Sequence, residues 1–229
     1  MFSVATYNVH RCIGRDRRRD PDRVRRVLHE LDARIVGLQE VESALPEEGP
    51  HLLALAQQDG FHVVSGPTLI HPGENGYGNA LLLSAPPLSV RRHDLSVAGR
   101  EPRGALDVTV GIDGSPLRVI VTHLGLRVDE RRRQFTQLLE VLGDCRDMAT
   151  VLLGDFNEWR PRTRALRDIA RALTDSPSVR TYPARRPLFA LDRIWVSAHL
   201  QQHAVAAHSS GWALSASDHL PLKARLELL

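Results

Sequence analysis

The chain has 229 residues, of which 42% are hydrophobic and 25% charged, which is typical of an ordinary globular protein. No apolar run approaches the roughly 20 residues that a membrane-spanning helix needs, so we expect no stable membrane insertion. The net charge of +3 is a small excess that suits a polyanionic partner such as nucleic acid. Of the 30 basic residues, 29 are arginine, which could reflect either phosphate binding or genome composition.

The N-terminus and the cysteines indicate the cellular compartment. The first residues lack a basic region followed by an apolar stretch, so they do not resemble a secretory signal. Cys12 and Cys145 are the only cysteines, and their spacing favours two unpaired thiols in a reducing environment. We therefore expect a cytoplasmic protein.

The first third of the chain predicts strands and helices in alternation. A strand over 2–10 leads into a basic loop over 11–19, which is either a solvated charge run or a phosphate-attracting rim. Asp20 as N-cap and Pro21 in the first helical position begin a helix. The elements expected next are a strand over 35–40, a helix over 50–58, a strand over 61–65, a loop over 67–76 and a strand over 77–84.

The remainder predicts an antiparallel meander followed by further alternation. The expected elements are strands over 88–97, 105–112 and 117–123, a helix over 129–142, a strand over 150–154, a helix over 162–173 and strands over 191–196 and 220–228. There is no linker, fixed-period repeat or low-complexity segment. The sequence therefore predicts one α/β domain with two sheets over residues 1–229.

Polar residues of interest stand where predicted strands end or begin. Those that follow an apolar strand run are Asn8, Glu40, His123, Asp155 and Asn157, whereas Asp192 and the pair Asp218-His219 stand at the start of a strand. Antiparallel neighbours can bring strand starts and strand ends to one edge of a sheet. A lone strand-end Asp or Asn is usually a turn former, but the whole set together indicates a site.

These side chains offer mainly hard, oxygen-rich ligands for a metal ion. Carboxylates, amides and imidazoles with few sulfurs suit Mg²⁺, with Mn²⁺ as a possible substitute. A hard dication beside histidines indicates hydrolysis of a phosphate ester, because the metal neutralises charge on the transferring group. No Gly-rich phosphate-binding loop is present, so a kinase or GTPase has no support.

Seven short motifs resemble those of the endonuclease/exonuclease/phosphatase superfamily. They are Thr6-Tyr7-Asn8, Leu38-Gln39-Glu40, Gly78-Asn79-Ala80, Thr122-His123-Leu124, Gly154-Asp155-Phe156-Asn157, Leu191-Asp192-Arg193-Ile194 and Ser217-Asp218-His219. The compact length, with Thr122–Arg127 and Asn157–Arg160 beside the motifs, is most similar to its small stand-alone bacterial members. The resemblance implies a four-layer α/β sandwich like that of deoxyribonuclease I, with two mixed β-sheets face to face and helices outside.

The resemblance also implies roles for the individual residues. Glu40 would be the principal Mg²⁺ ligand, helped by Asn8 and Asp218. Asp155 and Asn157 would orient the attacking water and the scissile phosphate. Asp192 would pair with His219, and His123 would contact the phosphate or protonate the leaving oxygen. The group that removes the water's proton is either Asp155 or the Asp192–His219 pair.

Four further residues are expected near the substrate. Arg103 and Arg127 could clamp phosphate oxygens, with a surface salt bridge as the alternative. Asn79 stands where deoxyribonuclease I-like members have the glutamate partner of the acid histidine, and an amide cannot support a positive charge as a carboxylate would. Trp159 could stack on a base or a lipid head group, or serve packing alone.

These expectations lead to one main hypothesis and its alternatives. We expect a Mg²⁺-dependent phosphoesterase acting on a phosphodiester, with nucleic acid, DNA first, as the substrate. The alternatives are a phospholipid or head-group phosphodiesterase, for which only Leu69-Ile70 with Tyr77 suggests a membrane-facing loop, a small-molecule phosphatase, and an inactive binding module of the same fold.

Overall fold

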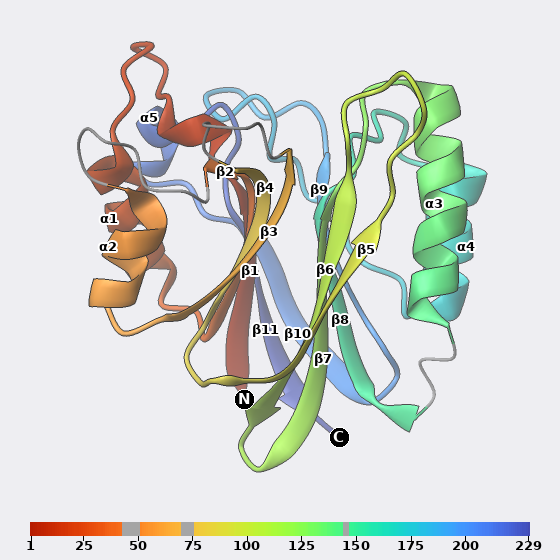
Figure 1. Ribbon diagram of the computed structural model, residues 1–229. Helices are drawn as coiled ribbons and strands as arrows, with labels where there is room; N and C mark the ends of the chain where they lie inside the picture. The colour runs from red at the N-terminus through yellow and green to blue at the C-terminus, as the bar shows by residue number, and fades with distance from the viewer. Residues whose placement is uncertain (43–50, 70–75, 144–146) are drawn as a thin grey trace.

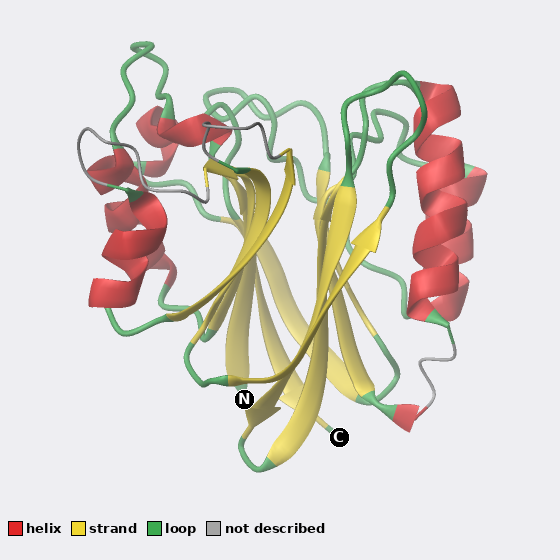
Figure 2. Ribbon diagram, viewed as in Figure 1, coloured by secondary structure: helices red, strands yellow, loops and turns green. Residues whose placement is uncertain are grey.

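The computed structural model describes residues 1–42, 51–69, 76–143 and 147–229. Two mixed β-sheets pack face to face with helices on both outer faces (Figures 1 and 2), which confirms the predicted four-layer α/β sandwich. The six-stranded sheet has the order β10-β11-β1-β2-β4-β3 and the five-stranded sheet the order β5-β6-β7-β8-β9. In each sheet one strand pair is parallel, β1 with β2 and β7 with β8, and the other pairs are antiparallel.

The described strands and helices have the following bounds. The strands are β1 (Phe2–Asn8), β2 (Ile35–Glu42), β3 (His62–Leu69), β4 (Tyr77–Leu83), β5 (Pro87–Asp94), β6 (Gly104–Ile112), β7 (Ser115–His123), β8 (Ala149–Asp155), β9 (Asp192–Val196), β10 (Leu200–Ala207) and β11 (Leu222–Leu228). The helices are α1 (Pro21–Leu31), α2 (Leu52–Gln58), α3 (Val128–Leu142), α4 (Arg164–Ala172) and α5 (Ala213–Ala216), with a short 3-10 turn η1 (His10–Cys12).

Three apolar clusters hold the four layers together. The largest lies between the sheets and includes Val4, Val121 and Leu153. A second lies between the six-stranded sheet and α1, α2 and α5, and a third between the five-stranded sheet and α3 and α4. The central strands of each sheet are thus buried on both faces, so they are apolar runs rather than alternating ones. No helix of the described residues has the length and apolar character needed to cross a bilayer.

The first helix begins as the sequence predicts. The Asp20 side chain accepts a hydrogen bond from the backbone N–H of Arg23, and Pro21 fills the first helical position. Cys12 is buried and unpaired, and Cys145 lies outside the described residues.

Three segments differ from the sequence prediction. Residues 67–69 were expected in a loop, but they belong to β3, where a β-bulge between Pro67 and Leu69 accommodates the proline on the outermost strand of the sheet. The remainder of that expected loop, 70–75, lies outside the described residues, as does residue 50 of the predicted second helix. Strand β10 and helix α5 were not predicted, because the edge strand β10 mixes polar with small apolar residues and is exposed or half-buried beyond Leu200, and α5 has only four residues.

The strand ends and strand starts that hold the expected site residues lie at one edge of the molecule. Strands β1, β2, β7 and β8 end at the top of Figure 1, and β9 and β11 begin there. The parallel pairing of β7 with β8 places His123 opposite Asp155, and the antiparallel pairing of β8 with β9 places Asp155 opposite Asp192. Strand register alone therefore brings three expected site residues side by side.

Close contact between β7 and β8 requires a glycine at position 154. Gly154 has φ +150, and a methyl group added there would overlap the carbonyl oxygen of Thr122. We expect Gly154→Ala to lower the free energy of unfolding by about 3 kcal/mol, because the strands must separate next to His123 and Asp155. Urea unfolding measures the effect. Gly111→Ala, at a β6 position with open space around it, is the control and should stay within about 1 kcal/mol of the wild type. Equal stability of the two variants would contradict this account.

Candidate active site

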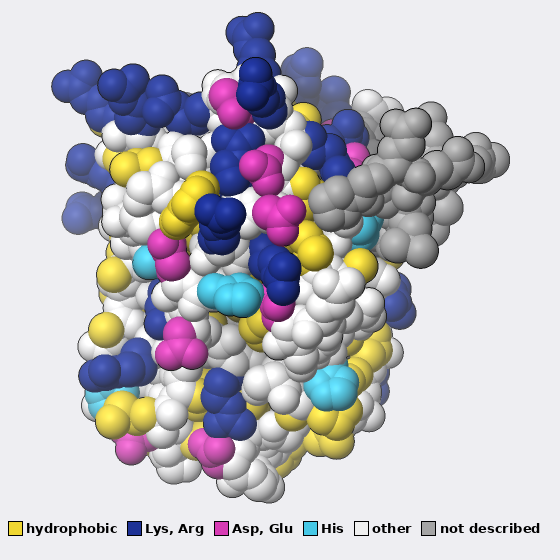
Figure 3. All heavy atoms as spheres, turned by 90° about the vertical axis from the view of Figure 1, so that its left-hand side faces the viewer, with side chains coloured by type: hydrophobic (Ala, Val, Ile, Leu, Met, Phe, Trp, Pro, Cys, Tyr) yellow, Lys and Arg dark blue, Asp and Glu magenta, His cyan; other side chains and the backbone are white. Residues whose placement is uncertain are grey.

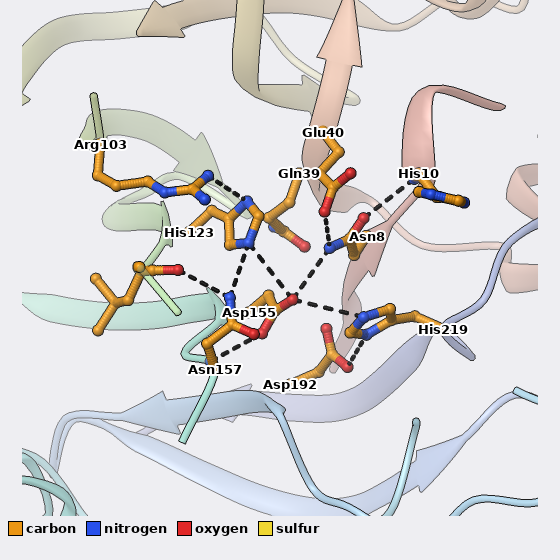
Figure 4. Close-up of polar contacts among 12 residues, drawn as sticks. Asn8, His10, Gln39, Glu40, Arg103, His123, Asp155, Asn157, Asp192 and His219 are labelled. Atoms are coloured by element: carbon orange, nitrogen blue, oxygen red, sulfur yellow. Dashed lines mark hydrogen bonds and ion pairs between the residues drawn. The ribbon is translucent and has the colours of Figure 1, made fainter. Parts of the chain in front are cut away.

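Asp155 lies at the centre of the polar residues (Figure 4). Its Oδ2 accepts a hydrogen bond from Nδ2 of Asn8 at 3.0 Å and lies 3.6 Å from Nε2 of both His123 and His219. Its Oδ1 accepts from the backbone N–H of Asn157 at 2.9 Å. The carboxylate is buried, with 1% of the residue exposed. Four other residues expected from the sequence therefore converge on this carboxyl group.

The six-stranded sheet contributes Asn8 and Glu40. Nδ2 of Asn8 also donates to Oε1 of Glu40 at 2.9 Å, and Oδ1 of Asn8 accepts from the backbone N–H of His10. Glu40 has φ +56 at the point where the β2–β4 register shifts between Leu38 and Val41. A β-bulge of this kind re-aims a side chain, and here it accompanies a partly exposed carboxylate beside Asn8.

A second carboxylate fixes the orientation of His219. Oδ2 of Asp192 accepts from Nδ1 of His219 at 2.9 Å and from Oγ1 of Thr181 at 2.5 Å. Burial, the largest single effect, lowers the pKa of His219, but the charges of Asp192 and Asp155 and the Asp192 hydrogen bond together raise this pKa to about 10. The metal-free site therefore holds His219 as an imidazolium at neutral pH.

The other imidazole has the opposite environment. Nδ1 of His123 lies 3.1 Å from Nη1 of Arg103, and Nε2 lies 3.0 Å from Nδ2 of Asn157. Burial, followed by the positive charge of Arg103, lowers the pKa of His123 to about 3. Both ring nitrogens face donors, Nη1 of Arg103 and Nδ2 of Asn157, and a neutral ring can accept at only one of them. We assign acceptance to Nδ1, beside the fixed charge of Arg103, which puts the ring proton on Nε2, 3.6 Å from the Asp155 carboxylate.

Three expected site residues lie apart from this centre. Nδ2 of Asn79 donates to the carbonyl oxygen of Gly104 at 3.0 Å, so its expected pairing with His123 is not among the hydrogen bonds of the described residues. The Asp218 side chain is 41% exposed and lies 3.8 Å from Nδ1 of His10. Arg127 is exposed at the start of α3, where its backbone N–H donates to Glu130.

The structure also places residues that the sequence did not single out. Thr181, which supports Asp192, comes from an irregular stretch with no motif. Ser217 donates from Oγ to the carbonyl oxygen of Asn8 and accepts from the backbone N–H of His219, which ties the two strand ends together. Gln39 lies beside His123 in Figure 4, and its Nε2 is buried without a hydrogen-bond partner in the described chain. Ser217 and Gln39 lie inside two of the seven motifs, so the motifs were the sequence signal that could have identified them.

Two sets of side chains have the donor chemistry for a divalent metal. One is Glu40 with Asn8, whose Oδ1 keeps a second lone pair beside the His10 hydrogen bond. The other is Asp155, Asp192 and His219, whose ligand atoms lie within 4.8 Å of one another. Oδ1 of Asp192 is buried without a hydrogen-bond partner in the described chain. Both sets are dominated by hard oxygen donors, which fits Mg²⁺ or Mn²⁺.

The two shifted histidines predict how stability depends on pH in EDTA. His123, with a pKa near 3 against an ordinary 6.5, contributes stability above pH 6.5 that is lost as the pH falls toward 3. His219, with a pKa near 10, contributes stability below pH 6.5 that is lost as the pH rises toward 10.

We therefore expect the free energy of unfolding of the metal-free protein to have a maximum near pH 6.5, as measured by urea unfolding across the pH range. His123→Gln should flatten the acidic limb, and His219→Gln should flatten the alkaline limb. An alkaline limb that is unchanged in His219→Gln would show that His219 is not held as a cation.

Comparison with known proteins shows the family to which the chain belongs. A sequence model of the Endonuclease/Exonuclease/phosphatase family matches residues 5–219. The uncharacterized protein YbhP of Escherichia coli is 32% identical over 247 aligned residues, which cover 99% of this chain and 96% of YbhP. The chain therefore belongs to the endonuclease/exonuclease/phosphatase family, whose members hydrolyse phosphoester bonds, and it is an enzyme of that class.

Solved structures show the same fold. An endonuclease/exonuclease/phosphatase from Beutenbergia cavernae is similar with a TM-score of 0.81 and 25% identity, covering 99% of this chain and 71% of that one. A mannosyl-6-phosphatase from Bacteroides thetaiotaomicron is similar with a TM-score of 0.78 and 16% identity, covering all of both chains. Family members generally use divalent metals, and the donor sets described above are compatible with one.

Proposed function

We propose that this chain is a Mg²⁺-dependent phosphodiesterase that cleaves its substrate by in-line attack of water, with nucleic acid, DNA first, as the substrate. Residues 1–229 form its single catalytic domain. The observation that carries the proposal is the position of Asp155 between two buried imidazoles with opposite pKa shifts. Titratable neighbours whose environments drive their pKa values apart are typical of acid–base chemistry.

Glu40 and Asn8, helped by Asp218, would hold the metal. His219 is already a cation between Asp155 and Asp192, so it offsets part of their negative charge and has no lone pair for a dication, which makes that trio less suited to a metal. Glu40 accepts from the neutral amide of Asn8 and forms no ion pair within the described residues. Bound there, the metal would neutralise negative charge on the phosphate oxygens.

Asp155 is the group best placed to orient the attacking water and accept its proton. With His219 protonated, the Asp192–His219 pair cannot accept another proton, which favours Asp155 of the two candidates for the base. His219 then contributes a positive charge that stabilises the developing negative charge on the phosphate. Asp192 and Thr181 hold the ring in the orientation that presents Nε2 to this centre.

His123 would contact the phosphate as a neutral hydrogen-bond donor. Arg103 holds Nδ1 as an acceptor, so Nε2–H is the group available to a phosphate oxygen, and a ring with a pKa near 3 does not carry the extra proton that a general acid would deliver. Arg103 therefore acts as a positioning residue for His123. Asn157 lies next to the same nitrogen and would orient the scissile phosphate from the other side.

The preference for nucleic acid rests on charge at the edge of the site. The basic loop continues from the end of β1, and dark blue side chains gather at the top of the molecule in Figure 3. The guanidinium of Arg11 lies 4.5 Å from the Tyr77 ring centroid, while Arg15 and Arg17 are exposed and have no ion-pair partner in the described chain. Such a rim attracts a polyanion.

Nicking of supercoiled plasmid by the purified protein with Mg²⁺ or Mn²⁺ tests the proposal. We expect nicked product that disappears in EDTA and in His219→Ala. Absence of nicking with either metal would reject DNA as the substrate. Phospholipids and small phosphate esters, such as the phosphorylated sugar named for the Bacteroides relative, would then be assayed.

A further inference from the structure

A groove runs along the outside of the five-stranded sheet between α3 and α4, which lie side by side in Figure 1. Its volume is about 870 Å³, and Phe135 of α3 lines it. We call this feature the α3–α4 groove. Three large apolar side chains on it are exposed: Leu126 by 66%, Val128 by 51% and Trp159 by 41%. Surface apolar side chains gathered in one hollow indicate a binding site.

The groove has an excess of positive charge. Arg132, Arg160 and Arg162 line it, are exposed and form no ion pair within the described chain. The acids of the groove are already engaged, since Glu158 pairs with Arg131 and Asp168 pairs with Arg164 and Arg171. An arginine guanidinium is suited to bidentate recognition of phosphate.

Aromatic rings connect the groove to the active site. The Tyr182 ring lies 4.8 Å from the His219 ring, and Trp159 lies 5.7 Å from Tyr182 and 4.8 Å from Phe189, measured between ring centroids. Trp159 belongs both to this series of rings and to the wall of the groove. A substrate with its phosphate beside His219 can therefore extend over the rings into the groove.

We propose that the α3–α4 groove binds the single-stranded continuation of a nucleic-acid substrate, beyond the nucleotide whose phosphate is cleaved. This rests on the proposed function. A polynucleotide alternates flat bases with phosphates, which matches a tryptophan beside unpaired arginines. The strand is single because stacking on Trp159 requires an unstacked base face.

The opposite outer face has a different character. Below the basic top, the face around α1 in Figure 3 shows Lys/Arg side chains interleaved with acidic ones. There Arg25 and His29 pair with Asp59, and His208 pairs with Glu30. These pairs compensate one another. Arg26 on this face forms no ion pair within the described chain, but its guanidinium already lies over the Trp212 ring, 4.2 Å from the ring centroid, so one face of this cation is covered. The α3–α4 groove is thus favoured over that face as the path of the strand.

Binding of fluorescein-labelled dodecamers of deoxyuridylate and uridylate, which differ only in the sugar, measured by fluorescence anisotropy in EDTA, tests the proposal without turnover. We expect Arg132→Glu with Arg162→Glu to raise the Kd about tenfold or more, and to reduce the salt slope by about 0.7 for each phosphate that the variant no longer neutralises. The control pair is Arg91→Glu with Arg225→Glu, two exposed arginines on β5 and β11 that make the same change in net charge. Trp159→Ala should raise the Kd about fivefold or more.

Each outcome has a definite meaning. The tighter of the two dodecamers identifies the preferred sugar. Equal weakening by the groove pair and the control pair, or no wild-type binding, would overturn the proposal. So would displacement of the dodecamer by phosphatidylglycerol vesicles or polyglutamate at lower concentrations than unlabelled oligonucleotide. Hydrolysis of bis(p-nitrophenyl) phosphate by the wild type is measured separately, so that its absence rejects the proposed function while the binding result stands.

Discussion

His219→Ala is expected to lower kcat by about 10³- to 10⁴-fold, the scale seen when an acid–imidazole pair is broken in other hydrolases. The ring is the cation nearest Asp155 on the side of Asp192, and its removal leaves both carboxylates uncompensated. Steady-state kinetics on a chromogenic phosphodiester measure the loss. A kcat within about tenfold of the wild type would contradict the assignment of His219 to the reaction.

Loss of folding must be separated from loss of chemistry in this experiment. An unpaired buried carboxylate costs about 3–5 kcal/mol, so His219→Ala can also lower stability. Thr181→Val is the matched variant, because it removes one hydrogen bond to Asp192 and leaves the His219 ring in place. We expect it to retain the fold and lose activity by a smaller factor. Asp192→Asn combined with His219→Ala should lower kcat little more than His219→Ala alone, because the two residues act as one unit.

The convergence of the site was predictable because it follows from strand ends. Asn8, His123 and Asp155 each follow an apolar run, and such runs become neighbouring buried strands whose ends share an edge. The resemblance of the motifs to a known family then implied a role for each residue, which the pattern of apolar strands alone leaves open. The contacts of Asp155 show that these three strand ends lie together, although they come from both sheets and not from one edge of a single sheet.

The partner of His123 was not predictable from the sequence, because it depends on the direction of a long side chain that lies just before strand β6. Strand β6 pairs with β7 so that Ala105 lies opposite Thr122, which brings Arg103 next to His123. The two-residue turn Asp113-Gly114 fixes that register, with Ile112 opposite Ser115, but Arg103 lies one residue before β6, so the pairing does not tell where its long side chain is directed. The family resemblance pointed to Asn79 instead, whose amide is directed to Gly104. The consequence is chemical, since an arginine keeps the imidazole neutral where a carboxylate would help it protonate.

Glu40→Gln is expected to weaken the apparent affinity for Mg²⁺ or Mn²⁺ by at least about 10²-fold, since even the loss of an indirect partner of a metal ligand costs 10–100-fold. The substitution keeps an oxygen that can accept the Asn8 hydrogen bond, so the fold around β2 should persist. Mn²⁺ binding followed by electron paramagnetic resonance measures affinity directly, and turnover at rising metal concentration measures it independently.

Glu42→Gln is the matched control for this prediction. Glu42 lies on the same strand and pairs with Arg19 at 3.1 Å, away from Asn8 and Asp155, so its loss should leave Mn²⁺ affinity within about twofold. Weak binding in Glu40→Gln beside normal binding in Glu42→Gln would place the ion at the end of β2. If Glu40→Gln bound Mn²⁺ normally while Asp192→Asn did not, the ion would instead belong to Asp155, Asp192 and His219. His219 would then have to give up its proton to ligate the metal, so binding would release a proton and strengthen as the pH rises toward 10.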